Sequence, residues 1–133
     1  MRILAIDYGS KRVGLAISEH ALLAHGFKTL ANNQHLLDTI VTIIKEREIA
    51  MVIIGNPKNM NGSLSLKSKE VVRFSKSLEK KIVPCKVILF DELLSTEEAN
   101  DIMNLVKTKK KKRKEIRDQI AAEIILRRYL TTS

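Results

Sequence analysis

The acidic residue Asp7 interrupts a segment that otherwise has the composition of a buried strand. It lies late in RILAIDY, residues 2–8, on the same side as Ile3 and Ala5, because side chains alternate between the two faces of a strand. A carboxylate is costly to bury unless it is paired, hydrogen-bonded or bound to a cation. The structural alternative is that Asp7 accepts hydrogen bonds from the amides of the turn at 9–11. Asp7 is therefore the first candidate for cation binding.

Two further acids, Asp91 and Glu92, come directly after the apolar segment VILF. In open α/β sheets, functional groups gather just beyond the carboxyl ends of strands. The structural alternative is that both acids only flank the next helix and interact favourably with its dipole.

Asp118 belongs to a segment, about 115–130, whose pattern predicts a helix. At about 100° per residue, Asp118 falls on the apolar side of this helix. It shares that arc with Ala121, Ala122, Ile125, Leu126 and Tyr129. The two small alanines predict a close approach of this helix to the sheet, which would bring Asp118 near the strand ends. The structural alternative for Asp118 is an ion pair with Arg117 or another basic neighbour.

Carboxylates from these three places are the oxygen ligands that Mg²⁺ prefers, and Mn²⁺ is expected to substitute for it. Two such ions about 4 Å apart would activate water and stabilise the leaving oxygen in phosphodiester cleavage. The pattern therefore predicts a two-metal hydrolase, if the acids converge.

The positive charge of the chain is concentrated in one short run. The 133 residues carry a net charge of +9, and 107–114 reads KTKKKKRK, so the rest of the chain is close to balanced. We expect this run to be a flexible arm that binds backbone phosphates; the alternative is a solvated, self-repelling loop. The expected nucleic-acid contacts in it are Lys109, Lys110, Lys111, Lys112, Arg113 and Lys114.

The elements that must position these residues form a single α/β domain over 1–133, since this length leaves no room for a second domain. The pattern predicts a mixed sheet of about five strands flanked by helices, with the first three strands antiparallel. The expected strands are 2–8, 12–18, 22–30, 50–55 and 84–90, and the expected helices are 34–48, 66–81, one opening at 95–98, and 115–130.

The remaining composition excludes several other classes of protein. The lone Cys85 cannot form an internal disulfide, and three scattered histidines lack the spacing of a zinc site. No apolar run is long enough to span a membrane, and the N-terminal apolar run is too short for a signal peptide. We expect a cytoplasmic protein with no membrane partner. Aromatic residues make up only 4%, so contacts with nucleic acid must depend mainly on charge.

Four stretches of the chain resemble the signature blocks of the YqgF/RuvX family of pre-16S rRNA nucleases, also described as Holliday junction resolvases. They are DYGSKRVGLAIS (7–18), GNPKNMNG (55–62), DELLSTEEA (91–99) and IRDQIAAEIILRRYL (116–130). The resemblance implies a ribonuclease H-like fold. It also implies that Asp7, Glu92 and Asp118 are the catalytic, metal-binding acids, with Asp91 a less certain neighbour.

Two positions depart from the family pattern. Leu93 stands where the third block usually has Arg, and Asn56 stands where the second block usually has Leu. Loss of that Arg removes a phosphate contact or a partner for a carboxylate. The basic residues then best placed to bind a phosphate are Lys11 and Arg12, although Arg12 has an alternative role in bracing the hairpin.

The resemblance favours a magnesium-dependent nuclease that processes the 5′ end of pre-16S rRNA during ribosome biogenesis. A DNA junction resolvase is one alternative and would require a homodimer on branched DNA, whereas the RNA nuclease can be a monomer. A non-catalytic, RNA-binding ribosome-assembly factor is another. An actin-like ATPase needs two domains to enclose its nucleotide, and 133 residues cannot supply both.

Overall fold

The computed structural model describes residues 1–57, 66–92 and 110–132, which contain one five-stranded mixed sheet. The strands are β1 (Ile3–Tyr8), β2 (Arg12–Ser18), β3 (His25–Ala31), β4 (Met51–Pro57) and β5 (Lys86–Glu92), and the helices are α1 (Leu36–Glu46), α2 (Leu66–Ile82) and α4 (Lys110–Thr132). Their order across the sheet is β3-β2-β1-β4-β5. The central strand β1 is antiparallel to β2 and parallel to β4; β3 is antiparallel to β2, and β5 is parallel to β4.

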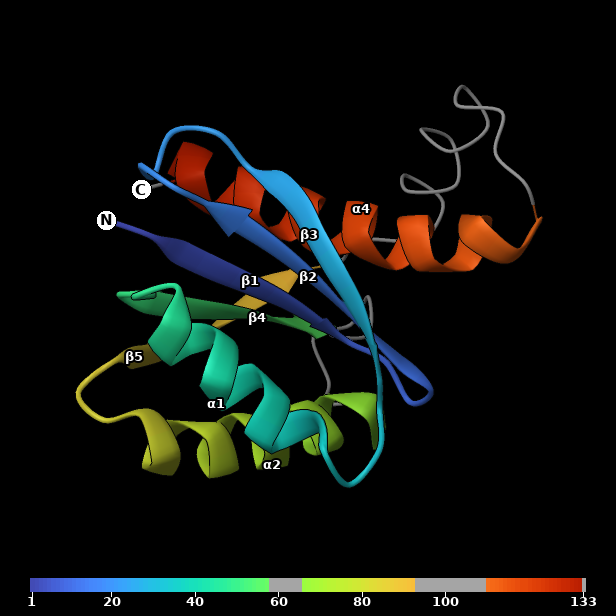
Figure 1. The fold of residues 1–133 in the computed structure, drawn as a ribbon, viewed down its shortest axis with the longest axis horizontal. Helices are drawn as coiled ribbons and strands as arrows, with labels where there is room; N and C mark the ends of the chain where they lie inside the picture. Colours follow the sequence, from blue (N-terminus) through green and yellow to red (C-terminus); the bar gives the residue numbers. More distant parts are fainter. Residues whose placement is uncertain (58–65, 93–109, 133) are drawn as a thin grey trace.

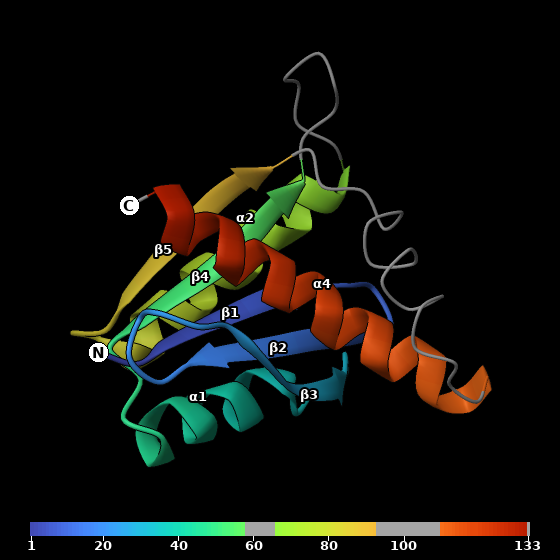
Figure 2. The same ribbon diagram turned by 90° about the horizontal axis from the view of Figure 1, so that it is seen from above.

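The described elements form three layers. Helix α4 covers one face of the sheet, and α1 and α2 cover the other (Figure 1). Seen from above, α4 crosses over the strands and its N-terminal part extends beyond them (Figure 2). Both termini lie at the end of the sheet opposite the β1–β2 turn (Figure 1).

Strand β1 contributes to both cores because its side chains alternate between the two faces. Ile3 and Ala5 pack with Ala122 and Ile125 of α4. Leu4 and Ile6 face the opposite core, together with residues of α1 and α2. The same alternation puts Asp7 on the face covered by α4, as the sequence predicts, and Tyr8 on the face covered by α1 and α2.

The predicted strand and helix order is confirmed in the described residues. The antiparallel hairpin of the first two strands, the third antiparallel strand and the parallel β4 and β5 are all present. The predicted helices at 34–48 and 66–81 correspond to α1 and α2, with ends that differ by a few residues. The helix predicted to open at 95–98 lies outside the described residues.

The expectation of a flexible basic arm is wrong for 110–114. Helix α4 begins at Lys110 rather than near Glu115, so this part of the basic run is helical. Lys and Arg have helix propensities close to that of Ala. Repulsion between two like charges one turn apart costs only about 0.2–0.5 kcal/mol. A helix already held on the sheet by its apolar residues can therefore extend through a basic run. Residues 107–109 lie outside the described residues.

Across the described ranges, no helix combines the length and the apolar character needed to cross a membrane.

Candidate functional site

Asp118 is brought to Asp7 by the close packing of α4 on β2. Gly14 is the partner of Asp7 in the antiparallel register of β1 and β2. A Cβ atom added to Gly14 would collide with the main-chain carbonyl of Asp118. Only a residue without a side chain lets the helix backbone lie on the strand at this point. The two acids predicted from opposite ends of the chain therefore lie together at the carboxyl end of β1.

The carboxyl group of Asp7 lies in an environment that favours its protonated form. Removal from water raises the pKa of Asp7 above its usual value; the positive charge of Lys67 opposes this rise, and the negative charge of Asp118 adds to it. The net effect is a raised pKa. Asp7 is thus a carboxylate that a bound cation would stabilise.

Asp118 has a cationic partner from the β1–β2 hairpin. The Nε of Arg12 donates a hydrogen bond of 2.7 Å to Oδ2 of Asp118. Their side chains are 31% and 16% exposed, so this ion pair is only partly solvated. The sequence allowed an ion pair with Arg117 or another basic neighbour, and the partner is Arg12. The predicted phosphate-binding residue Arg12 is therefore engaged with an acid in this structure.

The Nε of Arg117 is buried and has no hydrogen-bond partner among the described residues. It precedes Asp118 on α4, and nothing in the described residues explains its burial.

Asp91 belongs to a different polar cluster, on the face of the sheet covered by α2. Its Oδ1 accepts a 3.0 Å hydrogen bond from Nδ2 of Asn56, and Oδ1 of Asn56 accepts a 2.7 Å bond from the hydroxyl of Ser68. Asn56 and Ser68 are buried. Asp91 follows Val87 and Leu89 at intervals of two, and both of these pack on the core beneath α1 and α2. The structure thus groups Asp91 with Asn56 and separates it from Asp7.

Glu92 is the last residue of β5, where it pairs with Pro57 of β4. Its position follows Ile88 and Phe90 at intervals of two, and those two side chains pack on the core beneath α4. Among the described residues, no three His, Cys, Asp or Glu side chains form a group that could hold a metal ion.

The hydrogen bonds that join Asn56 to Asp91 and Ser68 should contribute to the stability of the fold. Asn56→Ala should lower the free energy of unfolding by about 1–3 kcal/mol, because it removes the buried hydrogen bond from Ser68 and the hydrogen bond to Asp91. Urea unfolding followed by circular dichroism measures the change. The control is Gln34→Ala, which truncates an exposed amide and should change stability by less than about 0.5 kcal/mol. Equal stability of Asn56→Ala and the parent would show that these hydrogen bonds contribute nothing.

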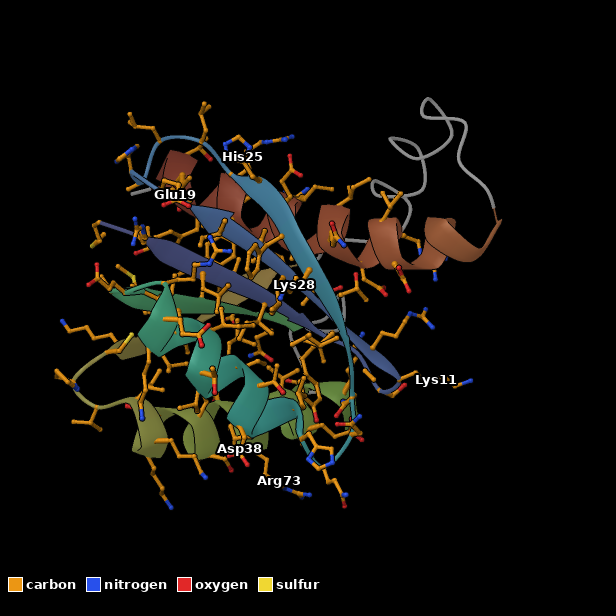
Figure 3. The ribbon with its side chains drawn as sticks, viewed as in Figure 1. Lys11, Glu19, His25, Lys28, Asp38 and Arg73 are labelled. Carbon is orange, nitrogen blue, oxygen red and sulfur yellow. The ribbon has the colours of Figure 1, made fainter. Side chains whose placement is uncertain are left out.

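The predicted basic contacts lie at the same end of the molecule as the acids. Lys11 is exposed at the tip of the β1–β2 turn and points away from the sheet (Figure 3). The backbone of 110–114 forms the start of α4, which extends beyond the sheet at that end (Figures 1 and 2). Lys109 lies outside the described residues.

Three features of the site were not predicted from the sequence. Gly14 carried a usable signal, since a glycine inside a strand often marks a close approach of another backbone. The pairing of Arg12 with Asp118 joins residues from opposite ends of the chain, and no local pattern indicates it. Lys67 has no sequence signal, because it is one exposed lysine among several on α2.

Comparison with known proteins identifies relatives of nearly the full length. The sequence profile of a family described as "RuvX: Holliday junction resolvase" matches residues 1–132. The chain is 40% identical to a protein of Thermoanaerobacter pseudethanolicus, covering 98% of this chain and 96% of the relative. It is 39% identical to a protein of Aster yellows witches'-broom phytoplasma, covering 96% and 87% respectively. Both relatives carry the name "Putative pre-16S rRNA nuclease".

Two solved structures share the fold at low sequence identity. A Fowlpox virus resolvase in complex with Holliday junction DNA aligns with a TM-score of 0.59 at 13% identity, covering 99% of this chain and 98% of that one. T. thermophilus RuvC in complex with a Holliday junction substrate aligns with a TM-score of 0.57 at 13% identity, covering 94% and 91%. The predicted ribonuclease H-like fold is confirmed by these likenesses. The profile match over residues 1–132 and the relatives at 39% and 40% identity show that this chain belongs to the RuvX family.

Proposed function

We propose that this chain is a metal-dependent nuclease that hydrolyses phosphodiester bonds in structured RNA, at the 5′ end of the 16S rRNA precursor. The observation that carries the proposal is the placement of Asp118 beside Asp7, fixed by the packing of α4 on Gly14. Two acids from distant parts of the chain meet at the carboxyl end of a central strand, where α/β proteins commonly have their functional groups.

The donor set fits a divalent cation. Asp7 is shielded from water and lies near the carboxylate of Asp118, and each of these makes its negative charge unfavourable. A cation bound between the two carboxylates would offset both the loss of hydration and the repulsion. Asp7 and Asp118 would hold Mg²⁺, or Mn²⁺ in its place, with Glu92 as the third acid rather than Asp91, which is engaged with Asn56. When bound, two such ions would activate the attacking water and stabilise the leaving oxygen.

The basic residues around the acids have separable roles in this proposal. Arg12 orients the carboxylate of Asp118 through its hydrogen bond to Oδ2. Lys67 favours the ionised form of Asp7, which is the form that binds a metal. Lys11, exposed at the turn, is available to contact the phosphate backbone of the substrate.

RNA is the favoured substrate because relatives at 36–40% identity carry the pre-16S rRNA nuclease name. The second candidate is a Holliday junction resolvase, which the description of the family and the junction complexes of the structural neighbours favour. That activity acts on a two-fold substrate and needs two sites, hence a homodimer.

Matched substrates separate these functions. The purified chain is incubated in Mg²⁺ with a 16S rRNA precursor fragment that carries its 5′ extension, and in parallel with a four-way DNA junction. We expect cleavage of the RNA at a defined position and an intact junction. Cleavage of the junction alone, by a protein with the solution mass of a dimer, would support the resolvase and overturn the RNA proposal. Salt-sensitive RNA binding with no cleavage would indicate the non-catalytic factor.

Replacement of the five basic residues 110–114 by Gln should weaken RNA binding about tenfold or more, because these residues would contact backbone phosphates. Each lost phosphate contact also reduces the magnitude of the negative slope of log K against log salt by about 0.7 for a single strand. Fluorescence anisotropy over a range of salt concentrations measures both quantities. The control removes the same charge elsewhere on the surface by replacing five exposed lysines with Gln: Lys45, Lys76, Lys80, Lys81 and Lys86. Equal losses in both variants would assign the effect to net charge alone.

A further inference from the structure

A cleft lies at the same end of β1 as the acids, but on the opposite face of the sheet. Its volume is about 510 Å³, and it lies between α2 and the segment that joins β3 to α1. The residues that matter for its chemistry are Tyr8, Ser10, Asn32, Glu70, Arg73 and Phe74. Clefts of this size commonly bind small organic molecules or single units of a polymer.

The wall of the cleft is aromatic and its rim is polar. The rings of Tyr8 and Phe74 pack with their centroids 4.8 Å apart and their planes at 34°. Glu70 and Arg73 lie three residues apart on α2, so they share one side of the helix, and both are exposed. No ion pair involving Arg73 is present among the described side chains. Its guanidinium group points outward from the α2 side of the molecule (Figure 3).

The cleft is preformed because the β3–α1 segment is fastened to the β1–β2 turn. The Nδ2 of Asn32 donates a 2.7 Å hydrogen bond to the carbonyl of Gly9. The main-chain amide of Asn32 donates a 2.9 Å bond to the carbonyl of Lys11. These bonds hold one side of the cleft on the same turn that carries Lys11 and Arg12.

The cleft is therefore connected to the acid site by one short piece of chain. Asp7 and Tyr8 are consecutive residues whose side chains leave β1 on opposite faces. The turn that follows them carries the exposed Lys11 at its tip (Figure 3). A polynucleotide with one phosphate at Asp7 and Asp118 can pass around this turn, with a phosphate at Lys11, to reach the cleft.

We propose that the cleft binds one unpaired nucleotide of the substrate RNA, a few nucleotides along the strand from the bond that is cleaved. The base packs against the half-buried ring of Tyr8, which the buried ring of Phe74 supports. The carboxylate of Glu70 accepts a hydrogen bond from a base amine or a ribose hydroxyl, and Arg73 binds the phosphate. This proposal rests on the proposed function, because it takes RNA as the substrate. It adds a requirement for a single-stranded nucleotide beside the structured part.

The test compares binding of two RNAs in EDTA, so that it does not depend on cleavage. One is a hairpin with a three-nucleotide single-stranded extension, and the other is the same hairpin with blunt ends. We expect the parent to bind the extended RNA about tenfold more tightly, and Arg73→Ala and Glu70→Ala to lose most of this preference. The control is Lys76→Ala, another exposed position on α2 outside the cleft, which should keep the preference. All three side chains are exposed, so the variants should fold normally.

Amide shifts in nuclear magnetic resonance spectra then locate the contact. Adenosine 5′-monophosphate should shift the amides of Ser10, Asn32 and Phe74 in the parent and should not do so in Arg73→Ala. An extension preference that survives Arg73→Ala would overturn the proposal. Shifts at the cleft without any extension preference would also overturn it, and would assign the cleft to a free nucleotide. Failure of the proposed function has a different result, which is loss of cleavage with cleft-dependent binding intact.

Discussion

Asp7→Asn is expected to abolish RNA cleavage, with a loss of at least about a hundredfold, since even residues that only support metal ligands contribute 10–100-fold. The amide keeps the size of the side chain but removes the charge that holds a divalent cation beside Asp118. A gel assay with labelled precursor RNA in Mg²⁺ measures the rate. The matched control is Asp38→Asn on α1, an Asp that lies away from the site and has a 3.5 Å ion pair with Lys81. It should cleave at the parental rate.

The same substitution should stabilise the metal-free protein. The pKa of Asp7 is raised in the folded state, so its favourable contribution is complete below the unfolded pKa near 3.8 and is lost as the pH rises through the folded value. At pH 7, above the unfolded value, the raised pKa makes the acid less favourable for folding than an uncharged side chain, and Asp7→Asn removes this penalty. Thermal unfolding in EDTA should give a higher Tm for the variant at pH 7 and a smaller difference near pH 4.

Added metal should make the parent more stable than Asp7→Asn. Mg²⁺ or Mn²⁺ should raise the Tm of the parent, because binding to the folded state stabilises it, and should raise the Tm of Asp7→Asn much less. A variant that is less stable than the parent in EDTA, or one that cleaves RNA at the parental rate, would contradict the assignment of Asp7.

Gly14→Ala is expected to destabilise the fold by about 3 kcal/mol or more, at the upper end of the cost of overpacking. The new Cβ would collide with the backbone carbonyl of Asp118, and a backbone cannot rotate away as a flexible side chain can. Helix α4 must move, and it carries Asp118 with it. Any folded fraction should therefore also lose cleavage. Urea unfolding and the cleavage assay together measure the two effects.

Gly26→Ala is the matched control, because Gly26 is also a strand glycine beneath α4. A Cβ there would approach only side chains, at 3.2 Å from Cβ of Gln119 and 3.7 Å from Oε2 of Glu123, and a shift of a few tenths of an ångström relieves the closer contact. The expected cost is about 1 kcal/mol or less. If Gly14→Ala were no more costly than Gly26→Ala, the close packing of α4 on β2 would be wrong.

The sheet and the face of Asp7 could be predicted because they depend on local rules. The short link between residues 8 and 12 leaves room only for a hairpin, and strict alternation in β1 assigns Asp7 to one face. The apolar arc around Asp118 similarly indicates which side of α4 meets the sheet. For Asp7 and Asp118, the repeat of apolar residues within a single strand or helix is enough to predict which face the side chain lies on.

The parts that could not be predicted depend on contacts between distant elements. The ion pair of Arg12 with Asp118 joins β2 to α4, and the hydrogen bonds of Asn56 join β4 to β5 and α2. Sequence position alone cannot decide whether Asp91 or Glu92 is the metal ligand. The hydrogen bond from Asn56 to Asp91 is the observation that favours Glu92. The start of α4 at Lys110 depends on helix propensity and packing outweighing charge repulsion, a balance that the basic run by itself does not reveal.

The most direct test of the proposed metal site is a crystal structure of the protein soaked with Mn²⁺, with the metal located by its anomalous scattering. We predict a manganese ion within about 2.2 Å of carboxylate oxygens from both Asp7 and Asp118, close to the distances of Mg²⁺ ligands, with Glu92 as a further ligand. Manganese bound elsewhere at saturating concentration, with Asp118 still paired only to Arg12 and Asp7 without a metal, would contradict a metal site at these two acids.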